Sequence, residues 1–560
     1  MSKLRNQYRI ILLLIGAVLY LPFLGQAPLF DWDEINFAES AREMLLTGDY
    51  FRVQINFQPF WEKPPLFFWL QAASMKAFGV NEYAARFPNA IFGIINLLML
   101  FEIGRKMRSE RFGFIMAILM GGSFLPHVYF KSGIIDPVFN TFIFAGIWFI
   151  SNAVRFYGQS SSIKYSILAG ISIGLAILTK GPVALLIALL TCFIFWAVKR
   201  FQPIASLKNI GLTALSIFLI SSLWFGAETL KNGPWFLEEF ISYQIRLFST
   251  PDAGHKQPIY YHFLIVLLGC FPMSLLALKA LFRRPQFRVE DADFLLWMKI
   301  LFWVVMILFS IVTTKIIHYS SLAYLPLSAI AAMSVEEYLR GRQKWTRLQA
   351  SLLLIPGIVI GLAMLILPYI GMNKEVILAL LKDEFAAGNL EAIVDWSYVD
   401  YLPGIIWISS LVAGLTYLSK GNYRTTISLL VGGCIVSTSL FLMRFPSRIA
   451  AFTQQASVDF YKQHEGEDIY IETLGFKSYA QYFYFKKQGL STEEIKNNKA
   501  KDGLYHIDAL RDWLMTGNID KPVYFVTKNI HADTYLNMDD IEFVDEKNGF
   551  VFLRRNVPVK

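Results

Sequence analysis

Charged residues and cysteines are both scarce in this chain of 560 residues. Asp, Glu, Lys and Arg make up 17% of the sequence, whereas hydrophobic residues make up 55% and the mean hydropathy is +0.44. A water-soluble globular enzyme and a disordered chain are both excluded, because each needs a larger polar fraction. The three cysteines, Cys192, Cys270 and Cys434, all lie in apolar runs, so neither a disulfide framework nor a paired-cysteine metal site is expected.

A basic domain of the kind that binds nucleic acid is also missing. The formal net charge is +9, but Lys and Arg occur in short clusters between apolar runs. The positive-inside rule explains such clusters as cytoplasmic loops of a membrane protein. Membrane lipids are therefore expected partners, and nucleic acid is not.

Long apolar runs are abundant, and thirteen of them predict membrane-spanning helices. The first follows a short basic head and no small-residue cleavage site follows it, which predicts an uncleaved helix with its N-terminus in the cytoplasm. Basic clusters then occupy every second loop, so these loops are cytoplasmic. The thirteen runs lie near residues 10–30, 87–101, 112–130, 137–154, 165–179, 183–198, 209–227, 257–278, 300–314, 316–335, 348–373, 402–419 and 425–443.

Two segments outside these runs complete the predicted architecture. The apolar stretch 64–80 would reverse every later loop if it crossed the membrane, so it is expected to lie on the outer surface as an interfacial helix. Residues 444–560 alternate strand-like and helical runs, which predicts a small mixed α/β domain outside the cytoplasm. We expect a polytopic α-helical membrane domain over 1–443, with a first outer loop at 31–86, followed by the C-terminal domain.

Ionisable residues gather in the predicted outer loops. The thirteen runs contain no Asp, Glu, Lys or Arg and show no internal repeat, whereas a transporter would place charges within broken helices of repeated halves. An enzyme acting at the outer membrane interface is therefore favoured over a carrier.

Two segments of the first outer loop carry a specific pattern, DWDEINFAESAREMLLTGDY at 31–50 and WEKPPLFFWL at 61–70. This pattern resembles the first periplasmic loop of the aminoarabinose transferase group, in the protein mannosyltransferase-like, or GT-C, superfamily of glycosyltransferases. Further segments at outer loops have counterparts in the same group. They are GIIDP at 133–137, LTKGP at 178–182, HKQPIYYH at 255–262 and KIIHYSSLAYLP at 315–326.

The resemblance implies a GT-C fold and an inverting transferase that moves a sugar from a polyprenyl (undecaprenyl) phosphate carrier to an acceptor outside the cytoplasm. The acceptor would be lipid A or another envelope lipid or glycan. Breaking the bond between an anomeric carbon and a phosphate develops positive charge on the sugar and negative charge on the phosphate, while the acceptor hydroxyl loses a proton. Such a site needs a carboxylate base and cations, and the outer loops contain both.

Three acidic residues are the candidate catalytic groups. Asp33 matches the first acid of the group's Asp-Glu pair and is the candidate general base; its alternative role is to cap the following helix. Asp136 matches a second outer-loop acid that would orient the acceptor or the sugar, or it caps a helix opened by Pro137. Glu34 completes the pair, and Glu34 and Glu39 would support Asp33 by holding Arg42 or the backbone.

Cations and aromatic residues are the candidates for binding the donor phosphate. Lys63 occupies the position that the group uses for this purpose, although an interfacial lysine that extends its ammonium to the membrane surface is the alternative. Lys180 and Lys315 are weaker candidates, because a single lysine at the end of a span is often only an anchor. His318, Tyr319 and Tyr324 would line the sugar or phosphate site, or belong to the interfacial aromatic belt.

A divalent metal is the only cofactor suggested, and the resemblance implies zinc. Glu62 and His255 would be its ligands, since zinc accepts carboxylate oxygen and imidazole nitrogen. A surface histidine is the alternative for His255.

Two other functions stay open. One is a protein O-glycosyltransferase of the mannosyltransferase type, whose product would remain with protein rather than with lipid. The other is a translocator of lipid-linked sugars without transferase activity. In each case the chain is expected in the inner (plasma) membrane, with the C-terminal domain in the periplasm or outside the cell.

Overall fold

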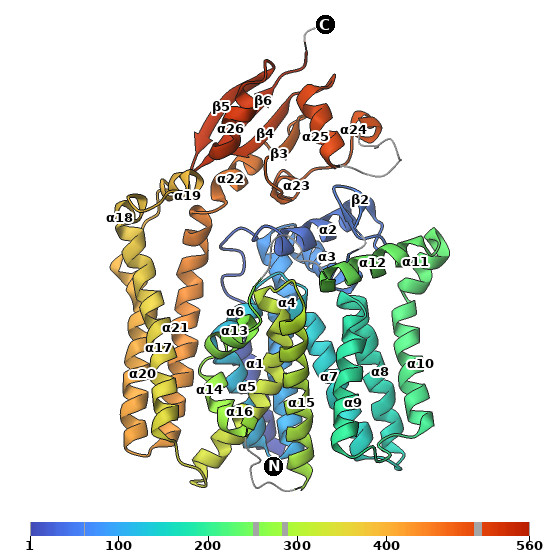
Figure 1. Cartoon of the computed structure of the whole chain (residues 1–560), viewed down its shortest axis with the longest axis vertical. Helices are drawn as coiled ribbons and strands as arrows, with labels where there is room; N and C mark the ends of the chain where they lie inside the picture. Colours follow the sequence, from blue (N-terminus) through green and yellow to red (C-terminus); the bar gives the residue numbers. More distant parts are fainter. Residues whose placement is uncertain (1, 61, 250–256, 283–288, 498–506, 559–560) are drawn as a thin grey trace.

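The computed structural model describes residues 2–60, 62–249, 257–282, 289–497 and 507–558. Most of the chain forms a bundle of helices, and a small sheet with short helices covers one end of the bundle (Figure 1). The N-terminus lies at the opposite end of the bundle from the sheet.

Seven helices of the described residues are long and apolar enough to span a membrane, or eight if a bent pair counts as one span. The bent pair is α10 (Leu207–Ser222) with α11 (Phe225–Asn232), which meet at 48°. The chain is therefore a multi-pass membrane protein. The seven are α4 (Glu82–Met107), α7 (Asp136–Arg155), α8 (Ser161–Lys180), α15 (Val289–Ile311), α17 (Arg347–Met372), α20 (Leu402–Ser419) and α21 (Tyr423–Ala451).

The other five predicted runs lie in shorter or broken helices, which the criterion of length and composition does not count as spans. The first run is helical only to Tyr20, and the segment after it is irregular because it contains Pro22, Gly25 and Pro28. These shorter helices are α1 (Ser2–Tyr20), α5 (Glu110–Gly121) with α6 (Phe124–Tyr129), α9 (Val183–Val198), α13 (Tyr261–Gly269) with α14 (Met273–Phe282), and α16 (Tyr324–Leu339).

A central group of helices has a lateral group on each side. Helices α17, α20 and α21 stand together at one side of the bundle, and α8 to α12 stand at the other (Figure 1). The remaining short elements near these helices are η2 (Ile317–Ala323), α12 (Trp235–Ser249), α18 (Lys374–Leu378), α19 (Glu384–Leu390) and η3 (Tyr398–Tyr401).

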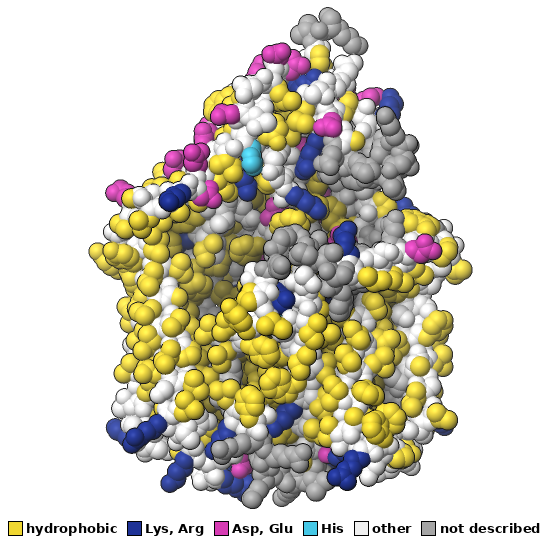
Figure 2. Space-filling model, viewed as in Figure 1, with side chains coloured by type: hydrophobic (Ala, Val, Ile, Leu, Met, Phe, Trp, Pro, Cys, Tyr) yellow, Lys and Arg dark blue, Asp and Glu magenta, His cyan; other side chains and the backbone are white. Residues whose placement is uncertain are grey.

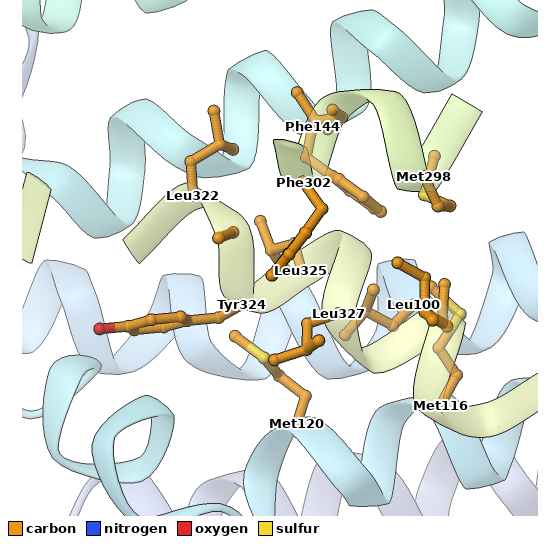
Figure 3. Close-up of a cluster of buried hydrophobic side chains, with 14 of the residues drawn as sticks. Leu100, Met116, Met120, Phe144, Met298, Phe302, Leu322, Tyr324, Leu325 and Leu327 are labelled. Carbon is orange, nitrogen blue, oxygen red and sulfur yellow. The ribbon is translucent and has the colours of Figure 1, made fainter. Parts of the chain in front are cut away.

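Apolar side chains form the packed centre of the bundle. Close approach of α4 and α5 depends on glycine, because a Cβ on Gly113 would lie 2.2 Å from the carbonyl oxygen of Phe101. The largest buried cluster joins α4, α5, α7, α15, η2 and α16. Figure 3 shows part of this cluster, including Leu100, Met116, Met120, Phe144, Met298, Phe302, Leu322, Tyr324, Leu325 and Leu327.

The sides and the two ends of the bundle differ in chemistry. Hydrophobic side chains cover its sides, as expected for a surface in contact with lipid (Figure 2). Lys and Arg gather along the lower end, and most of the acidic side chains visible in this view lie on the upper part.

Two short helices lie across the upper end of the bundle, beneath the sheet (Figure 1). They are α2 (Asp33–Thr47) and α3 (Leu66–Phe78), with a small hairpin of β1 (Gln54–Ile55) and β2 (Gln58–Pro59) between them. Helix α3 covers most of the stretch 64–80, and its 13 residues are too few to cross a hydrocarbon core of about 30 Å.

The C-terminal part is built around a four-stranded mixed sheet of order β3-β4-β6-β5. Strand β3 pairs in parallel with β4, and β6 pairs antiparallel with both β4 and β5. Helix α21 continues past the predicted domain boundary at residue 443 and ends at Ala451. The elements are α22 (Gln455–Gln463), β3 (Tyr470–Leu474), α23 (Ala480–Tyr484), α24 (Thr492–Asn497), α25 (Ile507–Thr516), β4 (Val523–Lys528), α26 (Asn529–Leu536), β5 (Ile541–Lys547) and β6 (Phe550–Arg555).

Candidate functional site

Four helix ends meet at the end of the bundle that the C-terminal domain covers. Asp33 is the first residue of α2, Asp136 is the first residue of α7, and Lys180 is the last residue of α8. His318 lies in η2, the short helix between α15 and α16. Each of these side chains therefore projects from the end of a regular element, where the polar backbone also changes direction.

The two candidate acids approach one histidine. Nε2 of His318 lies 3.3 Å from Oδ2 of Asp33 and 3.8 Å from Oδ2 of Asp136. The side chain of Asp33 is 41% exposed, whereas that of Asp136 is 5% exposed. Asp33 is thus the carboxylate that solvent and small molecules can reach, and Asp136 is the buried one.

Lys180 neutralises the buried acid. Its Nζ lies 2.6 Å from Oδ1 of Asp136 and 5.0 Å from the centre of the Tyr319 ring. Helix α8 ends directly after it, at Gly181, whose φ of 102° favours glycine. The LTKGP motif therefore ends the helix and places the ammonium at the site.

A cavity of about 60 Å³ lies beside this group. Lys63 and Lys180 both line it, so two ammonium groups and the carboxylate of Asp136 share one small space. Burial lowers the pKa of Lys63, and the charge of Lys180 lowers it further, while Glu62, Asp33 and Asp136 act in the opposite direction. The lining residues are Lys63, Asp136, Phe139, Asn140, Lys180, Val183, Ile187, Phe309, Val312, Tyr319 and Leu322.

A buried polar triangle next to the cavity was not predicted. Nδ2 of Asn140 donates to the hydroxyl oxygens of Tyr129 at 2.7 Å and of Ser321 at 2.8 Å, and Ser321 also donates to the main-chain carbonyl of His318. The network therefore ties α7 to the short helix that holds the histidine. The signal in the sequence is that Asn140 follows Asp136 by four residues, so both lie on one helix face.

The capping alternatives for the two acids are not what the structure shows. The N-cap of α2 is Trp32 and that of α7 is Ile135, and neither cap makes a side-chain hydrogen bond to its helix. Asp33 and Asp136 instead occupy the first helical positions, where negative charge is favoured by the helix dipole.

Glu34 faces away from the cavity, into a buried ion pair. Its Oε2 lies 2.7 Å from Nη2 of Arg86, which also donates to three main-chain carbonyls of residues 24–28. Burial acts to raise the pKa of Glu34, but the guanidinium and the N–H groups of Gly133 and Phe30 outweigh it and lower the pKa. Glu34 thus holds α2 in place. Glu39 pairs with Arg42 at 2.6 Å within the same helix.

The C-terminal domain holds the segment directly before Asp33. The main-chain N–H of Leu29 donates to the Tyr484 hydroxyl at 2.7 Å, and Gln454 Nε2 donates to the Leu29 carbonyl at 2.6 Å. Oδ1 of Asp31 accepts from the N–H groups of Trp32 at 2.9 Å and Tyr479 at 3.3 Å. We call residues 29–32 with these partners the clamp.

The clamp stabilises an unusual backbone. Trp32 has a φ of 81°, a left-handed value that costs energy for a residue with a side chain. Its ring lies 5.1 Å from Nζ of Lys477 in the C-terminal domain. Contacts from the far end of the chain therefore fix the direction in which α2 begins.

The remaining predicted residues lie apart from this cavity or outside the described residues. Nζ of Lys315 donates to the Val312 carbonyl at 2.8 Å and does not line the cavity. The Tyr324 ring lies in the apolar cluster beside Leu322 and Met120 (Figure 3), and its hydroxyl has no hydrogen-bond partner among the described residues.

The residues proposed for a metal do not form a site in the described part of the chain. Oε2 of Glu62 lies 3.9 Å from Nζ of Lys63, and His255 lies outside the described residues. The residues that the structure describes contain no cluster of three His, Cys, Asp or Glu side chains suited to a metal ion. Glu62 alone, facing an ammonium, does not fit a zinc ligand set.

The cavity offers two ammonium groups and a buried carboxylate, and His318 and the exposed carboxylate of Asp33 lie beside it. A carboxylate can accept a proton from a hydroxyl, and ammonium groups stabilise a phosphate. The surroundings are largely apolar, which strengthens each of these charges.

Comparisons with known proteins show what this chain is similar to. Residues 62–224 match the sequence model of a family described as dolichyl-phosphate-mannose-protein mannosyltransferase. The undecaprenyl phosphate-alpha-4-amino-4-deoxy-L-arabinose arabinosyl transferase 2 of Proteus mirabilis is 25% identical over 440 residues, covering 77% of this chain and 76% of the relative. The corresponding transferase of Edwardsiella ictaluri is 28% identical over 334 residues, covering 58% and 59%. The latter match thus spans less than two thirds of the relative's length.

A solved structure shows the same fold over nearly the whole chain. ArnT from Cupriavidus metallidurans, crystallised with undecaprenyl phosphate, superposes with a TM-score of 0.77 at 16% identity and covers 97% of each chain. The predicted fold class and the predicted resemblance to the aminoarabinose transferases are therefore confirmed, and the names of the relatives agree with the predicted enzyme class, a glycosyltransferase.

Proposed function

We propose that this chain, a GT-C glycosyltransferase of the aminoarabinose transferase type, moves a sugar from undecaprenyl phosphate or a similar polyprenyl phosphate to an envelope lipid or glycan. The observation that carries the proposal is the cavity in which Asp136, Lys63 and Lys180 meet beside Asp33. The names of the relatives and the carrier bound to ArnT support the choice of donor.

In the proposed reaction Asp33 is the general base. The acceptor hydroxyl attacks the anomeric carbon from the face opposite the phosphate, and its proton moves to the Asp33 carboxylate. His318 lies between the two acids and orients Asp33, while Asp136 keeps His318 and Lys180 in place. The bond between carbon and phosphate oxygen breaks with its electron pair leaving on the phosphate.

Lys63 and Lys180 receive that charge. Both ammonium groups line the cavity, and the negative charge of the leaving phosphate grows as the bond breaks. Because Lys180 is 2.6 Å from Asp136, a bound phosphate and Asp136 share the same cation. Lys63 is then the main contact with the donor in the ground state, and Lys180 gains importance as the phosphate leaves.

The central test is transfer of radiolabelled sugar from polyprenyl-phosphate donors to envelope extracts by the purified protein. We expect Asp33→Asn to lower turnover by about 10²–10⁴-fold, the range for removal of a general base, with donor binding nearly unchanged. Asp49→Asn is the matched control, because Asp49 lies in the same outer loop but pairs with Lys231, whereas Asp33 approaches His318. Undiminished turnover in Asp33→Asn would exclude Asp33 as the base.

The same assay separates the alternative functions. Label that remains with protein would indicate a protein O-glycosyltransferase, which the matched mannosyltransferase family favours. Label that passes across liposomes as intact carrier, with no transfer to any acceptor, would indicate a translocator. Label extracted with lipid or glycan supports the proposal.

Zinc stays a separate proposal with its own test. If Glu62 and His255 hold an ion, chelation and Glu62→Gln should lower turnover to a similar degree. Full activity after chelation, with no ion found by elemental analysis, would remove the metal. We also propose an inner-membrane location with the C-terminal domain outside the cytoplasm, which the order of basic loops supports.

A further inference from the structure

A much larger cavity lies at the opposite end of the bundle from the candidate site. It measures about 620 Å³ and lies between α5, α16 and α21, with Tyr8 of α1 at one side. Its walls are mainly apolar, with Phe114, Ile118 and Ile427 among them. This cavity separates α21, which stands with α17 and α20 at one side, from the central bundle. It plays no part in the proposed transfer.

Helices α5 and α21 touch beside this cavity, which we call the wedge. Gly122 follows α5, and a Cβ placed on it would lie 2.4 Å from Cγ1 of Val431, so the chain directly after α5 contacts α21 there. The next residue of α21, Gly432, lines the cavity, and a Cβ on it would meet no atom within 4 Å. The wedge is therefore open beside this contact, and its lining along α21 extends from Arg424 to Ile435.

Two arginines line the end of the wedge where α5 and α21 begin. Arg111 is the second residue of α5 and Arg424 is the second residue of α21, and both line the cavity and are exposed. Neither guanidinium makes an ion pair with another residue that the structure describes. The first turns of the two helices add positive potential at the same place.

The depth of the wedge matches one leaflet of a bilayer. From Arg424 to Ile435 helix α21 rises by about 16 Å, at roughly 1.5 Å per residue. Half of a hydrocarbon core of about 30 Å is nearly the same distance. A group that fills the wedge thus has an anionic head at the membrane surface and an apolar chain that reaches the midplane.

We propose that this wedge binds one anionic phospholipid, with its phosphate between Arg111 and Arg424 and an acyl chain along Phe114, Ile118 and Val431. Basic pockets between membrane helices bind such head groups, since the guanidinium–phosphate attraction adds to burial of the chain. The lipid joins α21 to α5 and α16 of the central bundle, at a place where α21 makes few contacts with these two helices. This proposal does not depend on the proposed transferase reaction.

The test is native mass spectrometry of the purified protein titrated with phosphatidylglycerol or with zwitterionic phosphatidylcholine. We expect one tightly retained phosphatidylglycerol in the wild type. Arg111→Gln with Arg424→Gln should weaken its apparent affinity about thirtyfold, which corresponds to the ~2 kcal/mol of two arginines beside an anionic lipid. Lys164→Gln with Arg200→Gln is the matched control, because it removes the same charge from other loops and should change little.

A second variant tests the cavity rather than the charge. Gly432→Leu places a side chain into the open part of the wedge and leaves both arginines intact, so it should also reduce retention of phosphatidylglycerol. Equal retention of the two lipids by the wild type, or unchanged affinity in the arginine variant, would overturn the proposal. Unchanged retention in Gly432→Leu would show that the chain lies elsewhere and overturn it as well.

Discussion

Lys63 shows how a single residue combines binding with sensitivity to pH. Its ammonium is buried beside a second ammonium, that of Lys180, and both effects lower its pKa. The carboxylates of Glu62, Asp33 and Asp136 act in the opposite direction but do not restore the usual value. A lysine in this state holds its proton weakly until an anion binds.

The apparent affinity for the donor should therefore fall as the pH becomes alkaline. A phosphate binds the protonated form of Lys63, and the lowered pKa of the free enzyme means that this form is lost at a lower pH than for an ordinary lysine. Binding is complete below that pKa and weakens as the pH rises through it. The KM for the donor, measured between neutral and alkaline pH, should rise in the wild type.

Lys63→Arg provides the matched comparison, because arginine keeps its charge over the whole range. We expect a KM that varies little with pH in this variant. Lys63→Ala should have a high KM at every pH. A wild-type KM that does not change with pH would contradict the assignment of Lys63 to the donor phosphate.

Some residues of the candidate site were predictable and their contacts were not. Asp33, Asp136, Lys63, Lys180, His318 and Tyr319 stand in outer-loop motifs, and the structure brings them together. Asp136 pairs with Lys180, 44 positions away in the sequence, and Glu34 pairs with Arg86, 52 positions away. The spacing of residues within a motif cannot reveal contacts between residues so far apart. Their roles in catalysis stay predictions.

At the scale of elements, the start of α2 holds the candidate base, Asp33. The helix begins directly after the strained backbone of Trp32, and the clamp fixes that backbone from the C-terminal domain. Gln454 both donates to the Leu29 carbonyl and accepts from the N–H of Asp31 at 3.3 Å. We infer that Gln454 is a positioning residue for Asp33.

Gln454→Ala should thus lower kcat while leaving the KM for the donor within about threefold. Loss of the two hydrogen bonds leaves buried polar groups unpaired and costs about 1–3 kcal/mol, so α2 starts in a less defined direction. Steady-state kinetics with a labelled donor would measure this split. Gln488→Ala, at an exposed glutamine of the same domain, should behave as the wild type. A raised KM with an unchanged kcat would place Gln454 in donor binding instead.

Helices were easier to predict than the segments between them. Charge-free runs marked the helices because few polar groups are tolerated in lipid. Residues 21–30 are equally apolar but irregular, and Leu24, Ala27 and Leu29 are buried by protein rather than by lipid. Hydropathy measures transfer out of water and does not distinguish these two surroundings.

On the scale of the whole molecule, the two ends of the bundle differ in the residues that they carry. The candidate site and the C-terminal domain occupy one end, and the wedge proposed to bind a lipid occupies the other. Lys and Arg side chains gather at that second end (Figure 2). The positive-inside rule assigns the second end to the cytoplasm.

Cysteine labelling tests this orientation. In spheroplasts, a membrane-impermeant maleimide should label Asp545→Cys in the C-terminal domain, and it should label Lys344→Cys only after lysis. The background should be low, because Cys270 and Cys434 are buried and Cys192 lies within α9. The reverse pattern would invert the proposed topology.

The clamp has a consequence for the order in which the protein is made. Leu29 and Tyr484 are 455 residues apart, and Asp31 and Tyr479 are 448 apart, yet both pairs are bonded next to the candidate base. A ribosome releases the first of each pair long before it makes the second. The candidate site is therefore completed only after the last helix and the C-terminal domain have been made, so a partly synthesised chain holds an unfinished site.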